Sequence, residues 1–216
     1  GNKHMKMILS PAKKMRVDPD SVSPASEPVF LSRSAVLLDY LRNLSYEEAK
    51  ALWRCSDRIA MENCRRIAGM DLSGGVTPAI LAYDGIAFTY MAPAVFEDGH
   101  FDYVQSHLRI LSGFYGVLRP MDGVTPYRLE MMAKVKLEGY RDLYAFWGDL
   151  LYREVRDESG LIINLASREY SACITPYLQP GDRYITCTFG ELQQDRIVQK
   201  GVYAKMARGD MVRFMA

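Results

Sequence analysis

Residues 161–170 read Leu161-Ile162-Ile163-Asn164-Leu165-Ala166-Ser167-Arg168-Glu169-Tyr170, an apolar run followed directly by polar side chains. The run is too short for a helix and follows Gly160, so it predicts a buried strand over Leu161–Asn164. In proteins that combine a sheet with helices, ligands gather beyond the ends of strands. The polar residues after this strand, which include Ser167, Glu169 and Tyr170, are therefore candidate site residues.

Two further segments have the same form. Met7-Ile8-Leu9 leads into Ser10 and Lys13, and Arg196-Ile197-Val198 leads into a segment that carries Tyr203, Lys205 and Arg208. If the three strand ends lie side by side, they form one polar cleft with a net positive charge, which suits an anion. The alternative is that each end is an ordinary solvated loop, and the sequence leaves both readings open.

The segment around Tyr203 is predicted to be helical. Lys205 and Arg208 are three residues apart, so a helix places them on one face. Two cations with a tyrosine nearby suit contact with phosphates and stacking on a base or sugar. A solvated helix face is the alternative.

A second group of cations lies in the middle of the chain, where Arg109, Arg119 and Arg128 occur with Tyr115 and Tyr127. Arginine can bind a phosphate group through two hydrogen bonds, so these residues are candidates for anion binding. They could equally form structural ion pairs, for which the acidic partners would be Asp122 and Glu130.

The periodicity of the whole chain predicts a mixed α/β fold, a central mixed sheet flanked by helices. Ser45 and Glu48 form a capping box at the start of one of the helices. The predicted helices cover residues 34–43, 46–53, 56–68, 101–111 and 142–157 and begin again at residue 202. Further strands are predicted at 80–83 and 87–90, around the turn Asp84-Gly85, and at 184–189, paired with 196–199. We expect a single domain over residues 5–216, with Gly1 to His4 a remnant of cloning.

Composition limits the function classes. The 216 residues are 49% apolar and 25% charged, and the net charge is only +1, so any basic site must come from local clustering. No apolar run is long enough for a membrane span or a signal peptide, which predicts a cytoplasmic protein without a membrane partner. The four cysteines and three histidines lack metal-ligand spacing, so neither a metal nor another cofactor is expected.

Several longer motifs resemble one known family, the YaaA family of bacterial peroxide-stress proteins. The resemblance runs in order from Met7 to Phe214. The matching stretches are Ser10–Lys13, Leu108–Asp122, Pro126–Met131, Leu143–Asp149, Asn164–Tyr170 and Tyr203–Gly209.

The resemblance implies a cytoplasmic protein that limits oxidative damage, in part by lowering free intracellular iron. It also implies binding of double-stranded DNA through a positive cleft, on a fold with a helix-hairpin-helix element. By position, that element would be the helices 34–43 and 46–53 around Leu44-Ser45, and Arg54 just after it matches the family pattern. Family members often carry Asp where Arg168 stands and Lys where Ala172 stands, and they continue beyond Phe214, so we expect a further C-terminal segment.

Two functions follow from these observations. The first is a DNA-binding protein of the response to hydrogen peroxide. The second is an enzyme that acts on a nucleotide or a nucleic-acid base, in which Lys13, Arg109 or Arg208 holds a phosphate-bearing ligand and Glu169 is the candidate acid or base. A broad open groove would favour the first function, and a closed pocket that holds these side chains would favour the second.

Overall fold

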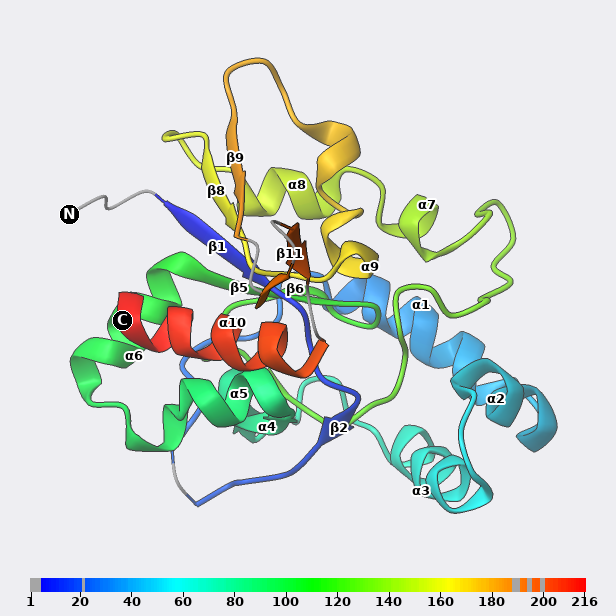
Figure 1. Cartoon of the computed structure of the whole chain (residues 1–216). Coiled ribbons are helices and arrows are strands. Elements are labelled where there is room, and N and C mark those ends of the chain that lie inside the picture. The colour runs from blue at the N-terminus through cyan, green and yellow to red at the C-terminus, as the bar shows by residue number, and fades with distance from the viewer. Residues whose placement is uncertain (1–4, 21, 188–190, 194–195, 199–200) are drawn as a thin grey trace.

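A computed structural model describes residues 5–20, 22–187, 191–193, 196–198 and 201–216, with only the backbone described between residues 191 and 203. A five-stranded sheet with the order β6-β5-β1-β8-β9 lies at its centre (Figure 1). The strands are β1 (Lys6–Leu9), β5 (Leu108–Ser112), β6 (Gly116–Leu118), β8 (Leu161–Asn164) and β9 (Arg183–Thr186). The prediction of a mixed α/β fold with a central mixed sheet is confirmed.

The order of the strands places a crossover at the centre of the sheet. β1 pairs in parallel with β5 on one side and with β8 on the other, β9 continues in parallel beyond β8, and only β6 is antiparallel. If the five strands are numbered by their order in the chain, they lie across the sheet in the order 3-2-1-4-5. The order in which strands are added therefore reverses between β1 and β8. In open α/β sheets such a switch point opens a crevice at the carboxyl ends of the strands.

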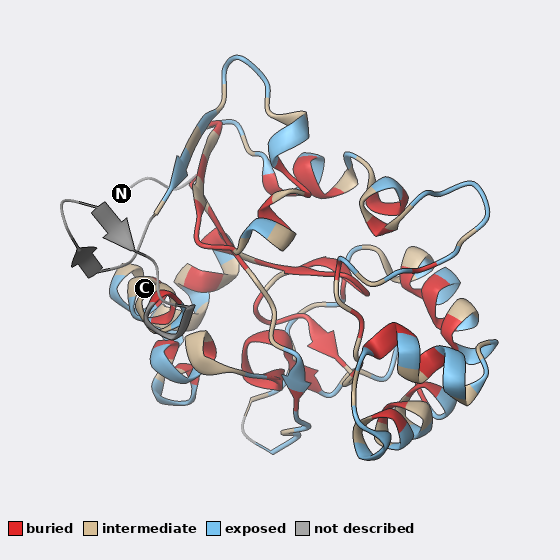
Figure 2. Ribbon diagram, turned by 45° about the vertical axis from the view of Figure 1, so that its right-hand side comes forward, coloured by how far each residue is buried: buried red, intermediate tan, exposed pale blue. Residues whose placement is uncertain are grey.

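The two strands beside this point are the apolar runs predicted from the sequence. Met7, Ile8 and Leu9 of β1 are at most 1% exposed, as is Ile162 of β8. Strands in the interior of a parallel sheet are covered on both faces, which explains why the β1 run is continuously apolar, whereas in β8 Leu161 and Ile163 are half-buried and burial alternates. Figure 2 shows the middle of the sheet in the buried colour.

Helices surround the sheet (Figure 1). The capping box predicted from Ser45 and Glu48 is present, with the Glu48 backbone N–H donating to Ser45 Oγ at 3.1 Å and the Ser45 N–H donating to Glu48 Oε1 at 2.9 Å. The helices are α1 (Leu31–Arg42), α2 (Tyr46–Trp53), α3 (Asp57–Ala68), α4 (Ala79–Ala82), α5 (Ile86–Met91), α6 (Asp98–His107), α7 (Leu143–Trp147), α8 (Leu150–Val155), α9 (Arg168–Ser171) and α10 (Gly201–Met215). No helix in the described part of the chain is both long and apolar enough to cross a membrane.

Three small two-stranded sheets complete the fold. They pair β2 (Lys14–Met15) with β4 (Tyr83–Asp84), β3 (Thr77–Pro78) with β7 (Gly123–Val124), and β10 (Glu191–Gln193) with β11 (Arg196–Val198). The predicted partner of residues 196–199 was therefore wrong, because β11 pairs with β10 and not with β9. Two residues separate β10 from β11 whereas nine separate β9 from β11, so pairing with β10 closes the shorter loop.

The strand predictions at 80–83 and 87–90 were also wrong. These residues form the short helices α4 and α5, and only Tyr83 and Asp84 are extended. Ile80, Leu81 and Ala82 are at most 1% exposed. A run that is buried on all sides has no polar face to set its period, so periodicity cannot distinguish a short helix from a strand.

Two predicted helices differ in extent. The helix predicted at 101–111 ends at His107, and Leu108–Ser112 is strand β5. The helix predicted at 142–157 is two helices, α7 and α8, because Gly148 has a positive φ of 52° and ends α7. Glycine adopts this left-handed conformation at little cost, so a helix commonly stops there.

Candidate functional site

A pocket of about 500 Å³ opens at the switch point of the sheet. Its lining comes from five separated segments: residues 9–14 after β1, 84–88 at the start of α5, 127–130, the residues Leu165, Ser167, Glu169 and Tyr170 after β8, and Lys205 and Arg208 of α10. The first and fourth segments follow the two strands that flank the switch point, which is where this topology positions a ligand.

Two serines join the strand ends across the switch point. The backbone N–H of Ser167 donates to Ser10 Oγ at 2.8 Å, and Ser10 Oγ–H donates to Ser167 Oγ at 3.1 Å. Ser167 precedes α9, and Leu165 N–H donates to the Ile8 carbonyl at 2.9 Å, which extends the pairing of β1 and β8 to the edge of the pocket. The ends of β1 and β8 are therefore physically joined, whereas β11, the third predicted strand, belongs to a separate two-stranded sheet.

Lys13 and Glu130 form an ion pair at the pocket, with 3.3 Å between Lys13 Nζ and Glu130 Oε1. The Lys13 side chain is 63% exposed, so the pair contributes little to stability. Glu169 is held differently, because the backbone N–H of Met132 donates to its Oε2 at 3.0 Å. Tyr144 fixes the backbone of the same residue by donating its hydroxyl to the Glu169 carbonyl at 2.6 Å.

Helix α10 brings Lys205 and Arg208 to the pocket, as their spacing predicted. Figure 1 shows α10 alongside α5, and the two helices pack closely at Gly209, where a Cβ atom would overlap the Ala87 carbonyl oxygen and lie 2.9 Å from Met91 N. Lys205 is exposed and Arg208 is half-buried. Neither forms an ion pair with any described residue.

Arg208 is the most unusual cation of the pocket. Its Nε is buried and has no hydrogen-bond acceptor among the described residues. Burial lowers the pKa of the Arg208 guanidinium, although an arginine still keeps its charge in a protein. A buried donor of this kind normally has a partner, so the site suits an anionic ligand.

The charges of the lining favour an anion overall. Five cationic side chains line the pocket, against three carboxylates. The cations are Lys13, Lys14, Arg128, Lys205 and Arg208, and the carboxylates are Asp84, Glu130 and Glu169. Arg128 is already engaged, because its Nε and Nη2 both donate to the Trp53 carbonyl at 3.3 Å.

Buried tyrosines form one side of the pocket. Tyr127 and Tyr170 line it, and the Tyr127 hydroxyl lies 2.7 Å from that of Tyr83 and 2.6 Å from Ser112 Oγ. Burial raises the pKa of Tyr127 and of Tyr170 far above the ordinary value, so both stay protonated. Apolar side chains, which include Leu9, Phe88 and Leu165, complete this side.

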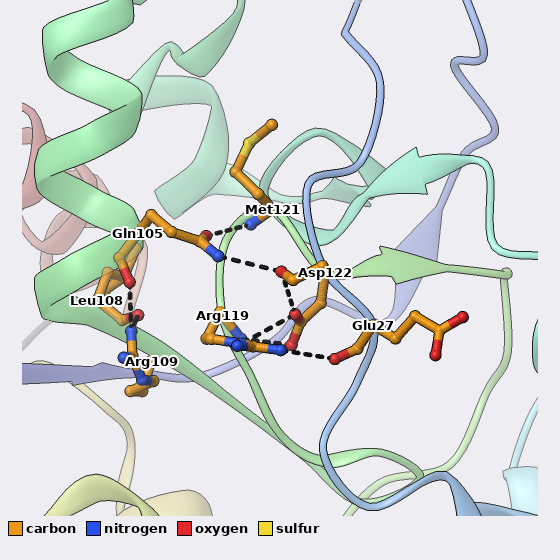
Figure 3. Close-up of polar contacts among 8 residues, drawn as sticks. Glu27, Gln105, Leu108, Arg109, Arg119, Met121 and Asp122 are labelled. Atoms are coloured by element: carbon orange, nitrogen blue, oxygen red, sulfur yellow. Dashed lines mark hydrogen bonds and ion pairs between the residues drawn. The ribbon is translucent and has the colours of Figure 1, made fainter.

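The other predicted site residues lie elsewhere. Arg109 is the second residue of β5, in register with Ile8 of β1, but it does not line the pocket, and its Nη1 donates to the carbonyls of Gln105 and Leu108 at 2.8 and 2.7 Å. Arg119 pairs with the buried Asp122 at 3.0 Å and donates to the Glu27 carbonyl at 2.7 Å (Figure 3).

Arg54 and Tyr203 complete the set of predicted residues. Arg54 is exposed at the end of α2, in the left-handed conformation with a φ of 51°, and it does not line the pocket. The backbone of Tyr203 belongs to α10, whereas its side chain lies outside the described residues. Ser10, Lys13, Arg128, Ser167, Glu169, Tyr170, Lys205 and Arg208 are the predicted residues that the fold brings together.

Sequence reasoning missed the part of the pocket formed by α5. Asp84 and Gly85 were interpreted as a hairpin turn, whereas Gly85 precedes α5 and a Cβ atom there would lie 2.7 Å from Ala12 Cβ. That close approach between the segments after β1 and before α5 has no signal in a single sequence. Lys14 directly follows Lys13 in the polar run after β1 and could have been predicted with it.

No group of three or more His, Cys, Asp or Glu side chains in the described part of the chain could hold a metal ion. The cysteines, Cys55, Cys64, Cys173 and Cys187, are all free thiols.

Comparison with known proteins gives a consistent family. The profile of the family described as peroxide stress protein YaaA matches residues 5–216. The chain is 60% identical over 212 residues to a UPF0246 protein of Agathobacter rectalis, which covers 98% of this chain and 85% of that protein. It is 57% identical to a UPF0246 protein of Desulfitobacterium hafniense and 49% identical to one of Lactiplantibacillus plantarum, each over 98% of this chain and over 84% and 86% of the relative.

Proposed function

This chain belongs to the family of the peroxide stress protein YaaA, and from that membership we propose that it binds DNA during peroxide stress. Binding would limit the damage that peroxide and intracellular iron cause to the DNA. The pocket at the switch point would hold a phosphate-bearing part of the nucleic acid. The observation that carries the proposal is the group of five cations around a buried Arg208 donor without an acceptor.

The size of the pocket determines how DNA would bind. A volume of about 500 Å³ equals a cube with an edge of about 8 Å, whereas the major groove of B-DNA alone is about 12 Å wide. The pocket is therefore too small for a duplex, which by the criterion drawn from the sequence favours the enzyme, and it lies within the range of roughly 300–1,000 Å³ that is usual for small ligands. A duplex would lie across the exposed Lys13 and Lys205, and one nucleotide at most would enter, as in proteins that extrude a base.

The test is equilibrium binding of a labelled duplex and of a labelled single strand to Lys205→Ala/Arg208→Ala. Two charge-assisted contacts are lost, so we expect at least about a tenfold loss of affinity. The matched control is Arg141→Ala/Arg153→Ala, which removes two exposed cations that do not line the pocket. Equal affinity of the two double variants would refute DNA binding through this site.

A second candidate function is an enzyme that acts on a nucleotide or a base. The observation that favours it is Glu169, whose carboxylate is positioned by the Met132 N–H within a pocket of small-molecule size. A fixed carboxylate beside a phosphate-binding group can act as an acid or base. Chromatographic analysis of nucleoside monophosphates and single strands after incubation tests this function: product from the wild type and none from Glu169→Gln supports it, and no product from either contradicts it.

A further inference from the structure

The pocket carries hydrogen-bonding groups that a phosphate cannot use. Glu169 lines it as a carboxylate, and one of its oxygens, Oε2, accepts the Met132 N–H at 3.0 Å. Neither a side-chain donor nor a cation among the described residues contacts its other oxygen. An ionised carboxylate only accepts hydrogen bonds, so this oxygen can accept one from a donor of the ligand.

A second group in the pocket has a fixed direction. Ser10 Oγ accepts the backbone N–H of Ser167, and its own proton goes to Ser167 Oγ. The Ser167 hydroxyl therefore receives one hydrogen bond and keeps its own proton, for which none of the described residues supplies an acceptor. A hydroxyl has one proton to donate, so Ser167 can offer it to a ligand.

The rest of the lining is partly charged and partly apolar. Lys205 and Arg208 extend from α10, whereas Leu9, Phe88 and Leu165 come from β1, from α5 and from the segment after β8. A ligand that satisfies the whole lining has an anionic group, a flat or apolar body, a donor for Glu169 and an acceptor for Ser167. A nucleotide whose base bears an exocyclic amino group meets all four conditions.

We infer that the pocket selects a cytosine, adenine or guanine nucleotide over a uracil or thymine nucleotide. The inference rests on the proposed function, because it assigns the phosphate to Arg208 and Lys205. The exocyclic amino group donates to the Glu169 carboxylate, and a ring acceptor of the base receives the Ser167 hydroxyl proton. Uracil and thymine present a carbonyl oxygen where cytosine presents its amino group, and their N3–H donor lies between two carbonyl oxygens that repel a carboxylate.

The sharpest test compares CMP with UMP, which differ in the group that would face Glu169. We expect the wild type to bind CMP on the order of tenfold more tightly in titration calorimetry, the lower part of the range for one base-specific contact. Glu169→Gln can turn its amide to donate to the uracil carbonyl, so the preference should fall to about onefold or reverse. Asp84→Asn removes the same charge from another lining residue and should keep the preference.

Further binding measurements distinguish a free nucleotide from one within a strand and test the role of Ser167. A tetranucleotide of dC against one of dT tests a nucleotide within a strand, and CMP against UMP tests a free one. Preference for the cytosine member of either pair supports the inference and identifies that source. Ser167→Ala should lower the affinity for CMP at least about threefold, which corresponds to the loss of one ordinary hydrogen bond. Circular dichroism and Tm confirm that each variant is folded.

Equal affinity within both pairs would overturn the inference, as would the absence of binding by all four ligands. Neither result decides the proposed function, which is judged by the duplex affinity of Lys205→Ala/Arg208→Ala against its control. Conversely, a preference for CMP with unchanged duplex binding in that double variant would retain the nucleotide pocket and reject DNA binding at it.

Discussion

Arg208 shows how a single residue can be held in a state that favours a ligand. Its guanidinium is half-buried, its Nε has no acceptor among the described residues, and burial lowers its pKa. Removing a charge from water without a partner costs free energy, so this residue opposes folding when the pocket is empty. An anion in the pocket would offset that cost.

This argument predicts that Arg208→Met leaves the free energy of unfolding of the empty protein within about 1 kcal/mol of the wild type, or raises it. The same variant should lose the rise in Tm that a bound nucleotide produces in the wild type. That rise reflects about 2.7 kcal/mol when the ligand is present at a hundred times its Kd. Differential scanning fluorimetry with and without CMP measures both effects.

Arg128→Met is the matched control for this prediction. Arg128 also lines the pocket, but its two bonds to the Trp53 carbonyl stabilise the folded chain. We expect it to lose about 1.5 kcal/mol of stability without ligand, the value for a charge-assisted hydrogen bond. If Arg208→Met proved the more destabilising of the two, Arg208 would have a structural role instead.

At the scale of elements, the close packing of α10 on α5 positions the two unpaired cations. Gly209 allows it, because any Cβ atom there would collide with the backbone at Ala87 and Met91. We predict that Gly209→Ala destabilises the protein by about 1–3 kcal/mol, the usual cost of overpacking. Displacement of α10 should also weaken nucleotide binding, which calorimetry with CMP measures.

Gly99→Ala is the control for the effect of the extra methyl group on a helix. Gly99 lies in α6, and a Cβ atom there would meet nothing within 4 Å. Alanine favours a helix over glycine by as much as about 1 kcal/mol, so this variant should be at least as stable as the wild type. Unchanged stability and binding in Gly209→Ala would show that α10 tolerates a shift without affecting the pocket.

The elements also show what a single sequence can and cannot predict. β1 and β8 were predicted because buried parallel strands are short apolar runs, whereas their adjacency was an assumption that the sequence left open and that only the structure establishes. Arg109 could not be assigned in this way. The strand that contains it was interpreted as the end of a helix, and only the hydrogen bonds from its Nη1 to the Gln105 and Leu108 carbonyls show that its side chain is held outside the pocket lining.

The ion pair of Arg119 could not be predicted because it depends on the burial of its partner, Asp122. The sequence left phosphate binding and pairing with Asp122 equally open, and the burial of Asp122 makes the pair observed at 3.0 Å necessary. Burial depends on long-range packing, here on residues 26 and 105, which contact the same acid or its neighbour from distant parts of the chain. No local pattern contains that information.

Asp182 links α8 to the edge of the sheet and gives a pH-dependent prediction. Burial acts to raise its pKa, but the Gln179 N–H, the Tyr152 hydroxyl and the Arg156 guanidinium all stabilise the carboxylate, and the net shift is downward. A carboxyl group whose pKa is lowered by folding contributes stability above its unfolded pKa of about 3.9, and the contribution is lost as pH falls through the lower, folded pKa.

Asp182→Asn should therefore lower Tm by several degrees at pH 7, in line with about 1.5–3 kcal/mol for bonds to a charged group. The difference from the wild type should shrink as the pH falls below about 4 and then through the lower, folded pKa, because the wild-type carboxylate takes up a proton over this range. Thermal unfolding followed by circular dichroism between pH 3 and 7 tests this, with the exposed Asp20→Asn as the control. A difference that is constant across this range would mean that the charge of Asp182 is not responsible.

At the scale of the whole molecule, the near balance of charge restricts how DNA can be held. The net charge is only +1, so the protein has no broad positive field, and attraction to DNA depends on local groups. Exposed cations lie on two surfaces at which DNA could bind. One is the pocket with its five cations, and the other is α3 with Arg58 and Arg65, beside the helices α1 and α2 of the expected helix-hairpin-helix element.

The salt dependence of duplex binding distinguishes these two surfaces. Each phosphate neutralised contributes about −0.9 to the slope of log K against log salt, so at most five pocket cations give a slope no steeper than about −4.5. We predict such a slope between 50 and 200 mM salt, less steep by about 1.8 in Lys205→Ala/Arg208→Ala and unchanged in Arg58→Ala/Arg65→Ala. A slope near −8 that falls in the α3 variant would assign DNA binding to the α1–α3 side of the molecule and leave the pocket to a small ligand, because five cations cannot release that many counterions.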